Sequence, residues 1–375
     1  MSERRYDIDW IRVIVFDILI FWHVGLFFVP WGNQVQWDLP MKNNVQVSWL
    51  FWPMLFIRQW RLPILFLVSG ISTQFSLSSK SGVKYLKERF RRLFVPLLTG
   101  MFIVVPPQVY MERLTQGTVD ISYFEYYPST FQGIYPDGNF SWGHLWFLAY
   151  LLIMSVVALP IFLYLRNNGT RLFNSFKRMI ERSPLYLYLF VIPLIIIEIT
   201  LEERFPLTMA LIDDWYAFSY YFVFFMAGFF LANLGGSLWK AFMKIRYLSL
   251  VTGLFASILV IWMLAKGESP LWVQILKPLN VWCWILTIFG FSSRYLNRES
   301  NILTYRNTAV YPFYILHFTI TLFLGYLLIN QSMHYALKMI IMVIGTFGLS
   351  WILYEYVIRR VALLRPLFGI KTIKP

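Results

Sequence analysis

Residues 9–30 read DWIRVIVFDILIFWHVGLFFVP, an apolar stretch long enough to cross a lipid bilayer as a helix. Arg12 and His23 interrupt this stretch. A helix turns about 100° and rises about 1.5 Å per residue, so the two side chains are predicted to lie nearly on one face, roughly 16 Å apart in depth. Ionisable side chains inside a bilayer are energetically costly, and their presence therefore predicts a function.

The composition of the whole chain predicts an all-α integral membrane protein. Hydrophobic residues make up 58% of the sequence, aromatic residues 20% and charged residues only 14%, and the mean hydropathy is +0.58. These values exclude an ordinary soluble domain. Ten segments are predicted to span the membrane: 9–30, 49–72, 93–110, 144–165, 185–201, 215–234, 247–265, 271–291, 308–330 and 335–357.

The basic residues predict how the chain is oriented in the membrane. Most of the 33 Lys and Arg residues fall in the terminal segments and alternate loops that would face the cytoplasm if the N-terminus does. Both termini are therefore predicted to be cytoplasmic. Phosphate groups of the inner leaflet explain the net charge of +14, so the charge does not call for a nucleic-acid partner.

A single transmembrane domain over residues 1–375 is predicted. The polar start MSERRYD leads directly into a full-length apolar segment, so the first helix is expected to be retained and not cleaved as a signal peptide. Between positions 171 and 182, apolar residues recur at helical spacing beside basic ones, which predicts a helix along the cytoplasmic interface. The longest outer loop, about 111–143, could cap an outward-facing cavity or contact a carbohydrate through its aromatic rings.

Five short motifs follow one another in a fixed order along the chain. They are DWIR at 9–12 with His23, RLPILFLVSG at 61–70, RFRRLFVP at 89–96, GHLWFL at 143–148 and YPFYILH at 311–317. Together they resemble the membrane-bound acyltransferase 3 family over nearly the whole chain. The second and fourth motifs are closer to the periplasmic-glucan succinyltransferase-like members. One departure is that Ala149 and Tyr150 follow the fourth motif, where many members carry acidic residues.

The resemblance implies an O-acyltransferase. Such an enzyme would move an acyl group, acetyl or succinyl, from cytoplasmic acyl-CoA to a hydroxyl of an extracytoplasmic or membrane-linked glycan. It also implies a multi-pass protein of the bacterial inner membrane. The expected partners are acyl-CoA, a carbohydrate acceptor and the lipid bilayer, and no metal is expected.

The resemblance and the side-chain chemistry together suggest the main roles. His23 is the candidate general base, because a neutral imidazole accepts a proton near neutral pH. An acyl-histidine intermediate is the alternative. Arg89 and Arg92, with Arg12, form the candidate clamp for the phosphates of acyl-CoA, because a guanidinium binds phosphate through paired hydrogen bonds. Arg12 is also a candidate catalytic residue, oriented by Asp9 three positions earlier.

Four further residues are candidates for substrate binding: Arg61, His317, Glu112 and His144. Arg61 lies within the second predicted span and His317 near the middle of the ninth, where polar side chains face a cavity or pair internally. Glu112 and His144 lie near the outer ends of the third and fourth spans.

Each assignment has a structural alternative. His23 and His317 could bridge helices by hydrogen bonding, and Arg12 could reach the membrane interface from a helix end. Arg89 and Arg92 are also expected from the orientation rule alone. An ordinary polar loop would explain Glu112, and His144 could lie at the membrane interface.

For the whole chain, the alternative functions are a multi-helix transporter or flippase for an anionic or glycan substrate and a non-catalytic scaffold. Transporters often contain related halves with interrupted helices, and the sequence has no such correspondence. A metal site is not predicted because the four histidines are widely spread.

Overall fold

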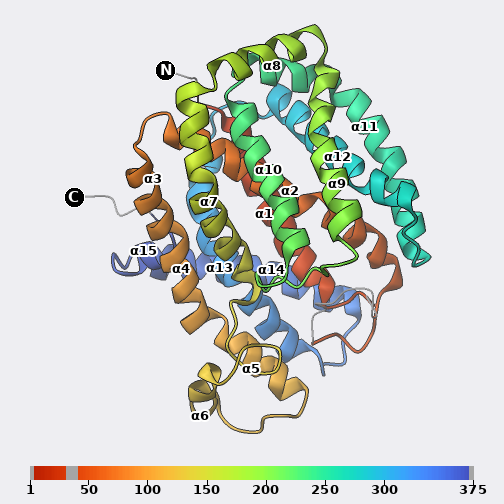
Figure 1. The fold of residues 1–375 in the computed structure, drawn as a ribbon. Helices are drawn as coiled ribbons and strands as arrows, with labels where there is room; N and C mark the ends of the chain where they lie inside the picture. The colour runs from red at the N-terminus through yellow and green to blue at the C-terminus, as the bar shows by residue number, and fades with distance from the viewer. Residues whose placement is uncertain (1–3, 31–40, 371–375) are drawn as a thin grey trace. The chain divides into compact units, whose positions relative to one another are not determined.

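The computed structural model describes residues 4–30 and 41–370, which form helices joined by loops, with no β-strand in these ranges (Figure 1). Labels beginning with η mark 3-10 or π-helical turns. The helices up to residue 145 are α1 (Tyr6–Leu26), η2 (Ser48–Leu50), α2 (Phe51–Leu77), α3 (Gly82–Arg89), η3 (Phe90–Phe94), α4 (Val95–Thr99), η4 (Gly100–Val104), α5 (Pro106–Thr115), α6 (Tyr123–Tyr126), η5 (Tyr127–Phe131) and η6 (Gly143–Leu145). The helices that follow are α7 (Trp146–Asn168), α8 (Thr170–Arg182), η7 (Pro184–Phe190), α9 (Val191–Leu201), α10 (Trp215–Ala232), α11 (Gly236–Ala265), α12 (Leu271–Tyr295), α13 (Asn301–Leu328), α14 (Tyr335–Ile352), η8 (Leu353–Ile358) and α15 (Leu364–Leu367).

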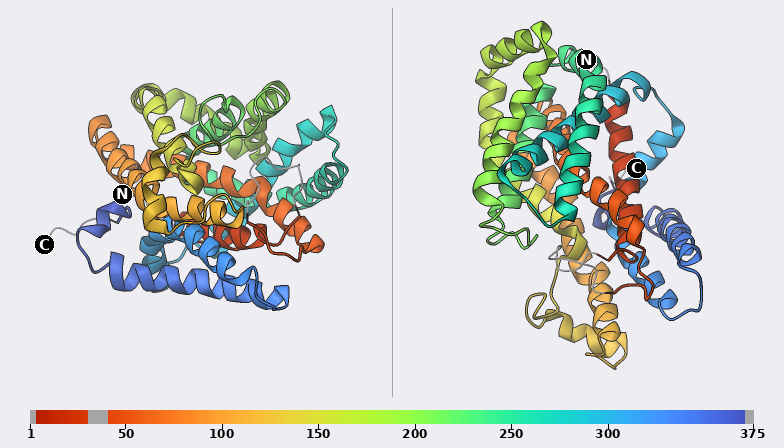
Figure 2. Two further views of the ribbon diagram at one scale, coloured as in Figure 1. Left: turned by 90° about the horizontal axis from the view of Figure 1, so that it is seen from below. Right: turned by 90° about the vertical axis from the view of Figure 1, so that its right-hand side faces the viewer.

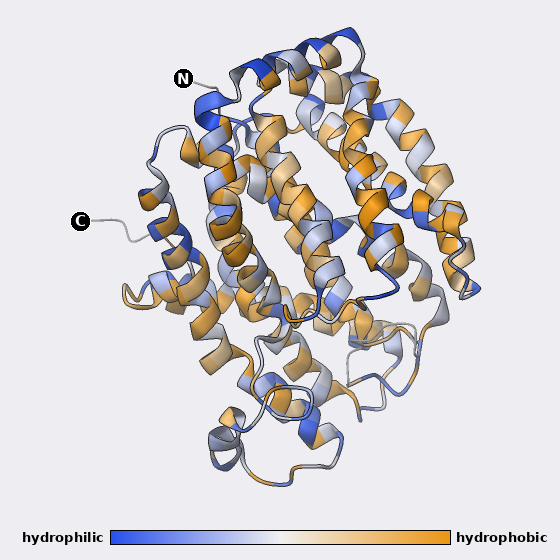
Figure 3. Ribbon diagram, in the orientation of Figure 1, coloured by the Kyte–Doolittle hydropathy of each residue, from blue (hydrophilic) through white to orange (hydrophobic). Residues whose placement is uncertain are grey.

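Within the described ranges, nine helical segments are long and apolar enough to cross a membrane, and hydrophobic residues dominate them (Figure 3). They match nine of the ten predicted spans and support a multi-pass membrane protein: Ser48–Leu77, Gly82–Thr115, Gly143–Asn168, Pro184–Leu201, Trp215–Ala232, Gly236–Ala265, Leu271–Tyr295, Asn301–Leu328 and Tyr335–Ile358. The remaining predicted span is α1, a continuous helix that carries Asp7, Asp9, Arg12 and Asp17. The count of ten spans and the cytoplasmic position of both termini stay predictions.

Several helices are longer than the apolar segments that the sequence predicts. α11 begins at Gly236 and not near 247, and α13 begins at Asn301 and not near 308. Polar and basic residues disfavour the hydrocarbon core, but most of them form helices readily. Hydropathy therefore locates the apolar part of each helix, while its ends lie further out.

The predicted amphipathic helix is confirmed as α8. Its Phe173 and Phe176 rings pack against Phe230 of α10, with centroids 5.2 and 5.4 Å apart. Hydrophilic residues cover much of the rest of α8 (Figure 3). Its position along the membrane interface stays a prediction.

The chain divides into two compact units, which we describe separately. Unit 1 comprises Met1–Val15, Leu55–Leu86 and Ile153–Thr304. Unit 2 comprises Phe16–Met54, Lys87–Leu152 and Tyr305–Pro375. The predicted organisation as a single domain stays a prediction.

Unit 1 contains two close helix contacts. α11 and α12 run side by side (Figures 1 and 2). α2 and α10 approach so closely that a Cβ at Gly70 would collide with the backbone oxygen of Phe225, and one at Gly228 with that of Leu67. Glycines at helix interfaces permit such close backbone approach in membrane proteins.

Replacing Gly70 by alanine is expected to lower the free energy of unfolding by about 1–3 kcal/mol, because the added methyl group meets a backbone atom that cannot rotate away. The matched control is Gly348→Ala in α14, where a Cβ meets no atom within 4 Å. Thermal stability in detergent measures both. Equal stability of Gly70→Ala and Gly348→Ala would contradict this packing.

Unit 2 packs part of α1 against α13 and the C-terminal helices. Ile20 of α1 joins Ala309 and Phe313 of α13 and Tyr354 of η8 in one buried cluster. This packing places the end of α1, which carries His23, beside the middle of α13.

Candidate active site

Two buried histidines meet inside unit 2. His23 lies in the last turn of α1 and His317 near the middle of α13. Nδ1 of His23 is 2.8 Å from Nε2 of His317, and the ring centroids are 4.9 Å apart. His23 is 9% exposed and His317 is fully buried. The fold therefore joins two candidate residues that are 294 positions apart in the sequence.

A backbone carbonyl sets the tautomers of this pair. Nδ1 of His317 lies 2.7 Å from the oxygen of Tyr314, and because a carbonyl only accepts, this nitrogen carries the hydrogen and donates it. Nε2 of neutral His317 is then an acceptor for the hydrogen on Nδ1 of His23. Neutral His23 consequently carries its lone pair on Nε2. That is the tautomer required of a base that acts through Nε2.

A third histidine, His144, lies next to the pair, with its ring centroid 5.3 Å from that of His317. Its Nε2 is 3.0 Å from the oxygen of Ile315, and its Nδ1 is 3.3 Å from Nε2 of Gln108. The hydroxyl of Tyr314 donates to the His144 oxygen at 2.8 Å. The bonds with Ile315 and Tyr314 tie His144 to α13 next to His317. The substrate-binding role of His144 stays a prediction.

Aromatic side chains surround the histidines. The ring of Phe318 lies 4.7 Å from that of His23 and 5.2 Å from that of His144. Trp22 is buried and donates from Nε1 to the oxygen of Met54 at 3.1 Å. The hydrogen bond between His23 and His317 is stronger in such low-dielectric surroundings than it would be in water.

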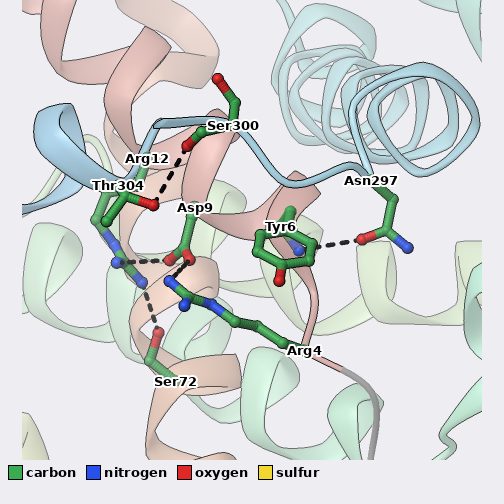
Figure 4. Close-up of polar contacts among 8 residues, drawn as sticks. All are labelled: Arg4, Tyr6, Asp9, Arg12, Ser72, Asn297, Ser300 and Thr304. Atoms are coloured by element: carbon green, nitrogen blue, oxygen red, sulfur yellow. Dashed lines mark hydrogen bonds and ion pairs between the residues drawn. The ribbon is translucent and has the colours of Figure 1, made fainter. Parts of the chain in front are cut away.

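Arg12 lies in unit 1, where Asp9 and Ser72 hold its guanidinium (Figure 4). Its Nη1 is 3.2 Å from Oδ1 of Asp9, and its Nη2 donates to Oγ of Ser72 at 2.9 Å. The predicted helical pair of Asp9 and Arg12 is therefore confirmed. The Arg12 side chain is 27% exposed, so it is oriented by the protein and still accessible.

Arg89 and Arg92 lie in unit 2, where helix α3 passes into the π-helical turn η3. Arg92 is exposed, and its backbone oxygen accepts a hydrogen bond from the Tyr311 hydroxyl at 2.6 Å. π-Helical turns are rare and often occur at functional sites. Because Arg12 belongs to the other unit, the predicted clamp of three arginines stays a prediction.

The two remaining candidates lie in different units. Arg61 lies in the part of α2 that belongs to unit 1 and is 2% exposed. Glu112 lies in unit 2, and its Oε1 accepts from the Tyr135 hydroxyl at 3.2 Å and from Nε2 of Gln116 at 3.3 Å. The substrate-binding roles of Arg61 and Glu112 stay predictions.

Comparison with known proteins gives the family. A family model described as an acyltransferase domain matches residues 5–355. The chain belongs to this acyltransferase family. Among its relatives is Glucans biosynthesis protein C of Escherichia coli O81 (strain ED1a), 26% identical over 389 residues that cover 99% of this chain and 96% of that protein. The protein of the same name from strain K12 / DH10B is 25% identical with the same coverage. No solved structure matches the chain.

The match confirms the predicted resemblance and identifies a membrane acyltransferase. The names of the two relatives agree with the predicted likeness to glucan-related members of the family. An acyltransferase is an enzyme, so the transporter and the scaffold lose their support.

Sequence reasoning did not find Thr319, which lies near the histidines of this acyltransferase. Thr319 accepts from Nε2 of Gln108 at 2.7 Å and donates to the oxygen of Val104 at 2.7 Å. The only sign of Thr319 in the sequence was its position two residues after His317. A hydroxyl in an apolar segment is common, because it bonds readily to a nearby carbonyl.

An ion network in unit 1 was also missed. Nζ of Lys277 lies 3.2 Å from Oε1 of Glu198 and 2.7 Å from Oε1 of Glu202. The hydroxyl of Tyr216 donates to Oε2 of Glu198 at 2.7 Å. Charged groups in membrane-spanning helices pair in this way because an isolated charge there is costly. The sequence offered one sign of this network: Glu198 and Lys277 are charged residues within the predicted spans 185–201 and 271–291.

Proposed function

We propose that this acyltransferase transfers an acetyl or succinyl group from cytoplasmic acyl-CoA to a hydroxyl of an extracytoplasmic or membrane-linked glycan, in the bacterial inner membrane. The contact between His23 and His317 carries the proposal, because it defines the tautomer that a neutral His23 would adopt inside a membrane acyltransferase. The names of the two relatives support a glycan acceptor.

In the proposed reaction, Nε2 of His23 accepts the proton of the acceptor hydroxyl. The hydroxyl oxygen attacks the carbonyl carbon of the thioester, and the bond between that carbon and the thioester sulfur breaks. His23 then gives its proton to the leaving sulfur. The products are an ester and a free thiol, and His23 returns to its starting tautomer.

His317 supports this cycle without contacting the reacting atoms. While His23 is doubly protonated, its Nδ1–H bond to Nε2 of His317 becomes a charge-assisted hydrogen bond, which is stronger than the neutral one. The carbonyl of Tyr314 keeps His317 in the accepting tautomer throughout. His317 is therefore a positioning residue.

The basic turn at the end of α3 supports a donor site for acyl-CoA. Arg91 and Arg92 are exposed and Arg89 is partly exposed, so their guanidinium groups can reach an anion outside the protein. Acyl-CoA carries several phosphate charges, and paired hydrogen bonds from arginine suit phosphate oxygens. The positive charge thus fits the donor's nucleotide end.

Replacing Arg92 by alanine is expected to raise the KM for acyl-CoA about tenfold with little change in kcat, because charge-assisted hydrogen bonds to a bound phosphate are worth about 1.5–3 kcal/mol. Arg89→Ala is expected to act in the same direction, and Arg92→Lys should recover part of the affinity. Arg171→Ala, an exposed arginine of α8, is the matched control. If Arg171→Ala and Arg92→Ala give the same donor KM, the donor site lies elsewhere.

The proposed reaction is tested with purified protein in lipid nanodiscs. Acetyl-CoA or succinyl-CoA is supplied with neutral gluco-oligosaccharides, and thiol release is measured together with the mass of each oligosaccharide. We expect thiol release in step with a mass gain of one acyl group. Thiol release without acylated sugar would contradict the glycan acceptor. An absence of both, with a donor that binds, would contradict the reaction.

A further inference from the structure

A row of aromatic rings lies on the loop formed by residues 116–142, which we call the aromatic loop. Tyr123 lies 6.0 Å from Phe124 and 6.0 Å from Tyr127, and Tyr127 lies 5.7 Å from Phe131, measured between ring centroids. Phe124 is 86% exposed and Phe131 is 49% exposed. Large aromatic side chains this exposed, grouped in one place, are typical of a binding surface.

The aromatic loop is built as an ordered element. Nη2 of Arg113 donates to the oxygens of Pro136 at 2.7 Å and Gly138 at 3.0 Å, which ties the far end of the loop to α5 (Figure 1). The hydroxyl of Tyr127 donates to the oxygen of Phe102 at 2.9 Å. Rings held in this way lose little conformational freedom when a ligand binds.

The charge of the aromatic loop argues against an anionic partner. Residues 116–142 contain Asp120, Glu125 and Asp137, and neither lysine nor arginine. Anionic lipid headgroups and phosphates attract basic residues, and this surface would repel them. Hydrogen bonds from Ser122 lower the pKa of Glu125, so this carboxylate is ionised at neutral pH and can accept from hydroxyl groups.

We propose that the aromatic loop is the docking surface for the glycan acceptor, a neutral gluco-oligosaccharide. The apolar C–H faces of its sugar rings would stack on Phe124 and Phe131, while its hydroxyls would donate to the carboxylates. Sugars combine an apolar face with many hydroxyl donors, and this surface offers the complement of both. The inference rests on the glycan acceptor of the proposed function.

The aromatic loop connects to the histidines within unit 2. The Tyr135 hydroxyl donates to Glu112 at 3.2 Å, and burial together with Glu112 raises the pKa of Tyr135 to about 12, so the hydroxyl stays protonated. Glu112 lies one helical turn from Gln108 on α5, and Gln108 contacts His144. An oligosaccharide bound to the aromatic loop would therefore lie on a loop that is held by α5, and α5 also contacts His144 through Gln108.

The inference is tested by titrating cellohexaose, maltohexaose and laminarihexaose against the full-length protein in nanodiscs, with saturation-transfer NMR as the readout of binding. We expect Phe124→Ala to raise the Kd of the bound oligosaccharide roughly fivefold, since one aromatic contact is lost. Phe124→Tyr keeps the ring and should stay within about twofold. Ile212→Ala, at a position that is 78% exposed in a loop of unit 1, is the matched control. Wild-type affinity in Phe124→Ala, or no binding of any of the three by the wild type, would overturn the docking surface.

A bilayer is the competing partner for exposed aromatic rings, and a fluorescent label distinguishes the two. The single native cysteine, Cys283, is buried, so Gln132→Cys on the loop can be labelled selectively with bimane. Bimane fluorescence that changes when oligosaccharide is added, and that brominated lipids do not quench, would support the docking surface. Quenching by brominated lipids that oligosaccharide does not relieve would assign the loop to the membrane and overturn the inference.

Thiol release with donor alone separates this inference from the proposed function. Slow transfer to water needs His23, so the wild type should show it and His23→Gln should lose it. If the wild type shows this reaction and Phe124→Ala keeps the wild-type KM for the oligosaccharide, only the docking surface fails. If the wild type neither releases thiol nor acylates a bound oligosaccharide, the proposed function fails. The effect of Phe124→Ala on the Kd of the oligosaccharide then tests the docking surface by itself.

Discussion

Replacing His23 by glutamine is expected to lower kcat for acyl transfer by roughly 10²- to 10⁴-fold, the range that a positioned general base contributes. Glutamine has nearly the same length and can still bond to His317, but it cannot accept the hydroxyl proton at neutral pH. The Kd for acyl-CoA should change little, because the donor's phosphates are assigned to Arg89 and Arg92. Thiol release and donor binding are measured on the same nanodisc preparation.

The matched control for His23→Gln is His334→Gln. His334 is exposed and caps α14 by accepting from the backbone N–H of Ala336 at 3.3 Å. It makes no contact with the histidine pair in the part of the chain that the structure describes. We expect near wild-type turnover for this variant. Equal rates for the two variants would contradict a base at His23.

Replacing His317 by alanine is expected to lower kcat roughly 10- to 100-fold, since it removes a buried hydrogen bond to a group that becomes charged, worth about 1.5–3 kcal/mol. The KM for either substrate should change little, because His317 acts through His23. A residue that merely filled space would affect stability and leave the kcat of the folded fraction unchanged.

A conservative variant separates positioning from packing. In His317→Gln the side-chain oxygen can accept the Nδ1–H of His23, so we expect several-fold recovery of kcat over His317→Ala. His317→Phe fills the space without an acceptor and should recover stability alone. If His317→Phe is as active as His317→Gln, the hydrogen bond has no part in the reaction.

Much of the fold follows from hydropathy because lipid imposes a simple rule on sequence. Apolar segments of sufficient length must be helical in a bilayer, since every backbone polar group has to be satisfied within the segment. In the part of the chain that the structure describes, nine of the ten predicted segments correspond to helices of suitable length and composition. The pairing of Asp9 with Arg12 was also predictable, because residues three apart are neighbours on a helix.

The contacts of the site were not predictable in the same way. His23 and His317 lie 294 positions apart, and no periodicity within one helix reveals which residue of another helix it faces. The π-helical turns at Phe90–Phe94 and Gly100–Val104 leave no mark in the hydropathy, since they change the hydrogen-bond pattern and not the composition. The motif resemblance brought both histidines forward as candidates, and only the fold shows that they touch.

The three histidines differ in their hydrogen-bond partners. His144 bonds to the backbone of α13 and to Gln108, whereas His317 bonds to both the α13 backbone and His23. In the proposed reaction, these bonds suit His144 to support, His317 to positioning and His23 to proton transfer. The predicted substrate-binding role of His317 stays a prediction, and the positioning role proposed above is an alternative to it.

The tautomer of His23 is the most direct test of the proposed general base. The protein has only four histidines, so 15N-histidine labelling of nanodisc samples gives few enough signals for assignment with His→Gln variants. At a pH where the rings are neutral, we expect a protonated Nδ1 and an unprotonated Nε2 at His23, with this preference lost in His317→Phe. A proton on Nε2 of His23 in the wild type, insensitive to His317, would contradict the proposed base.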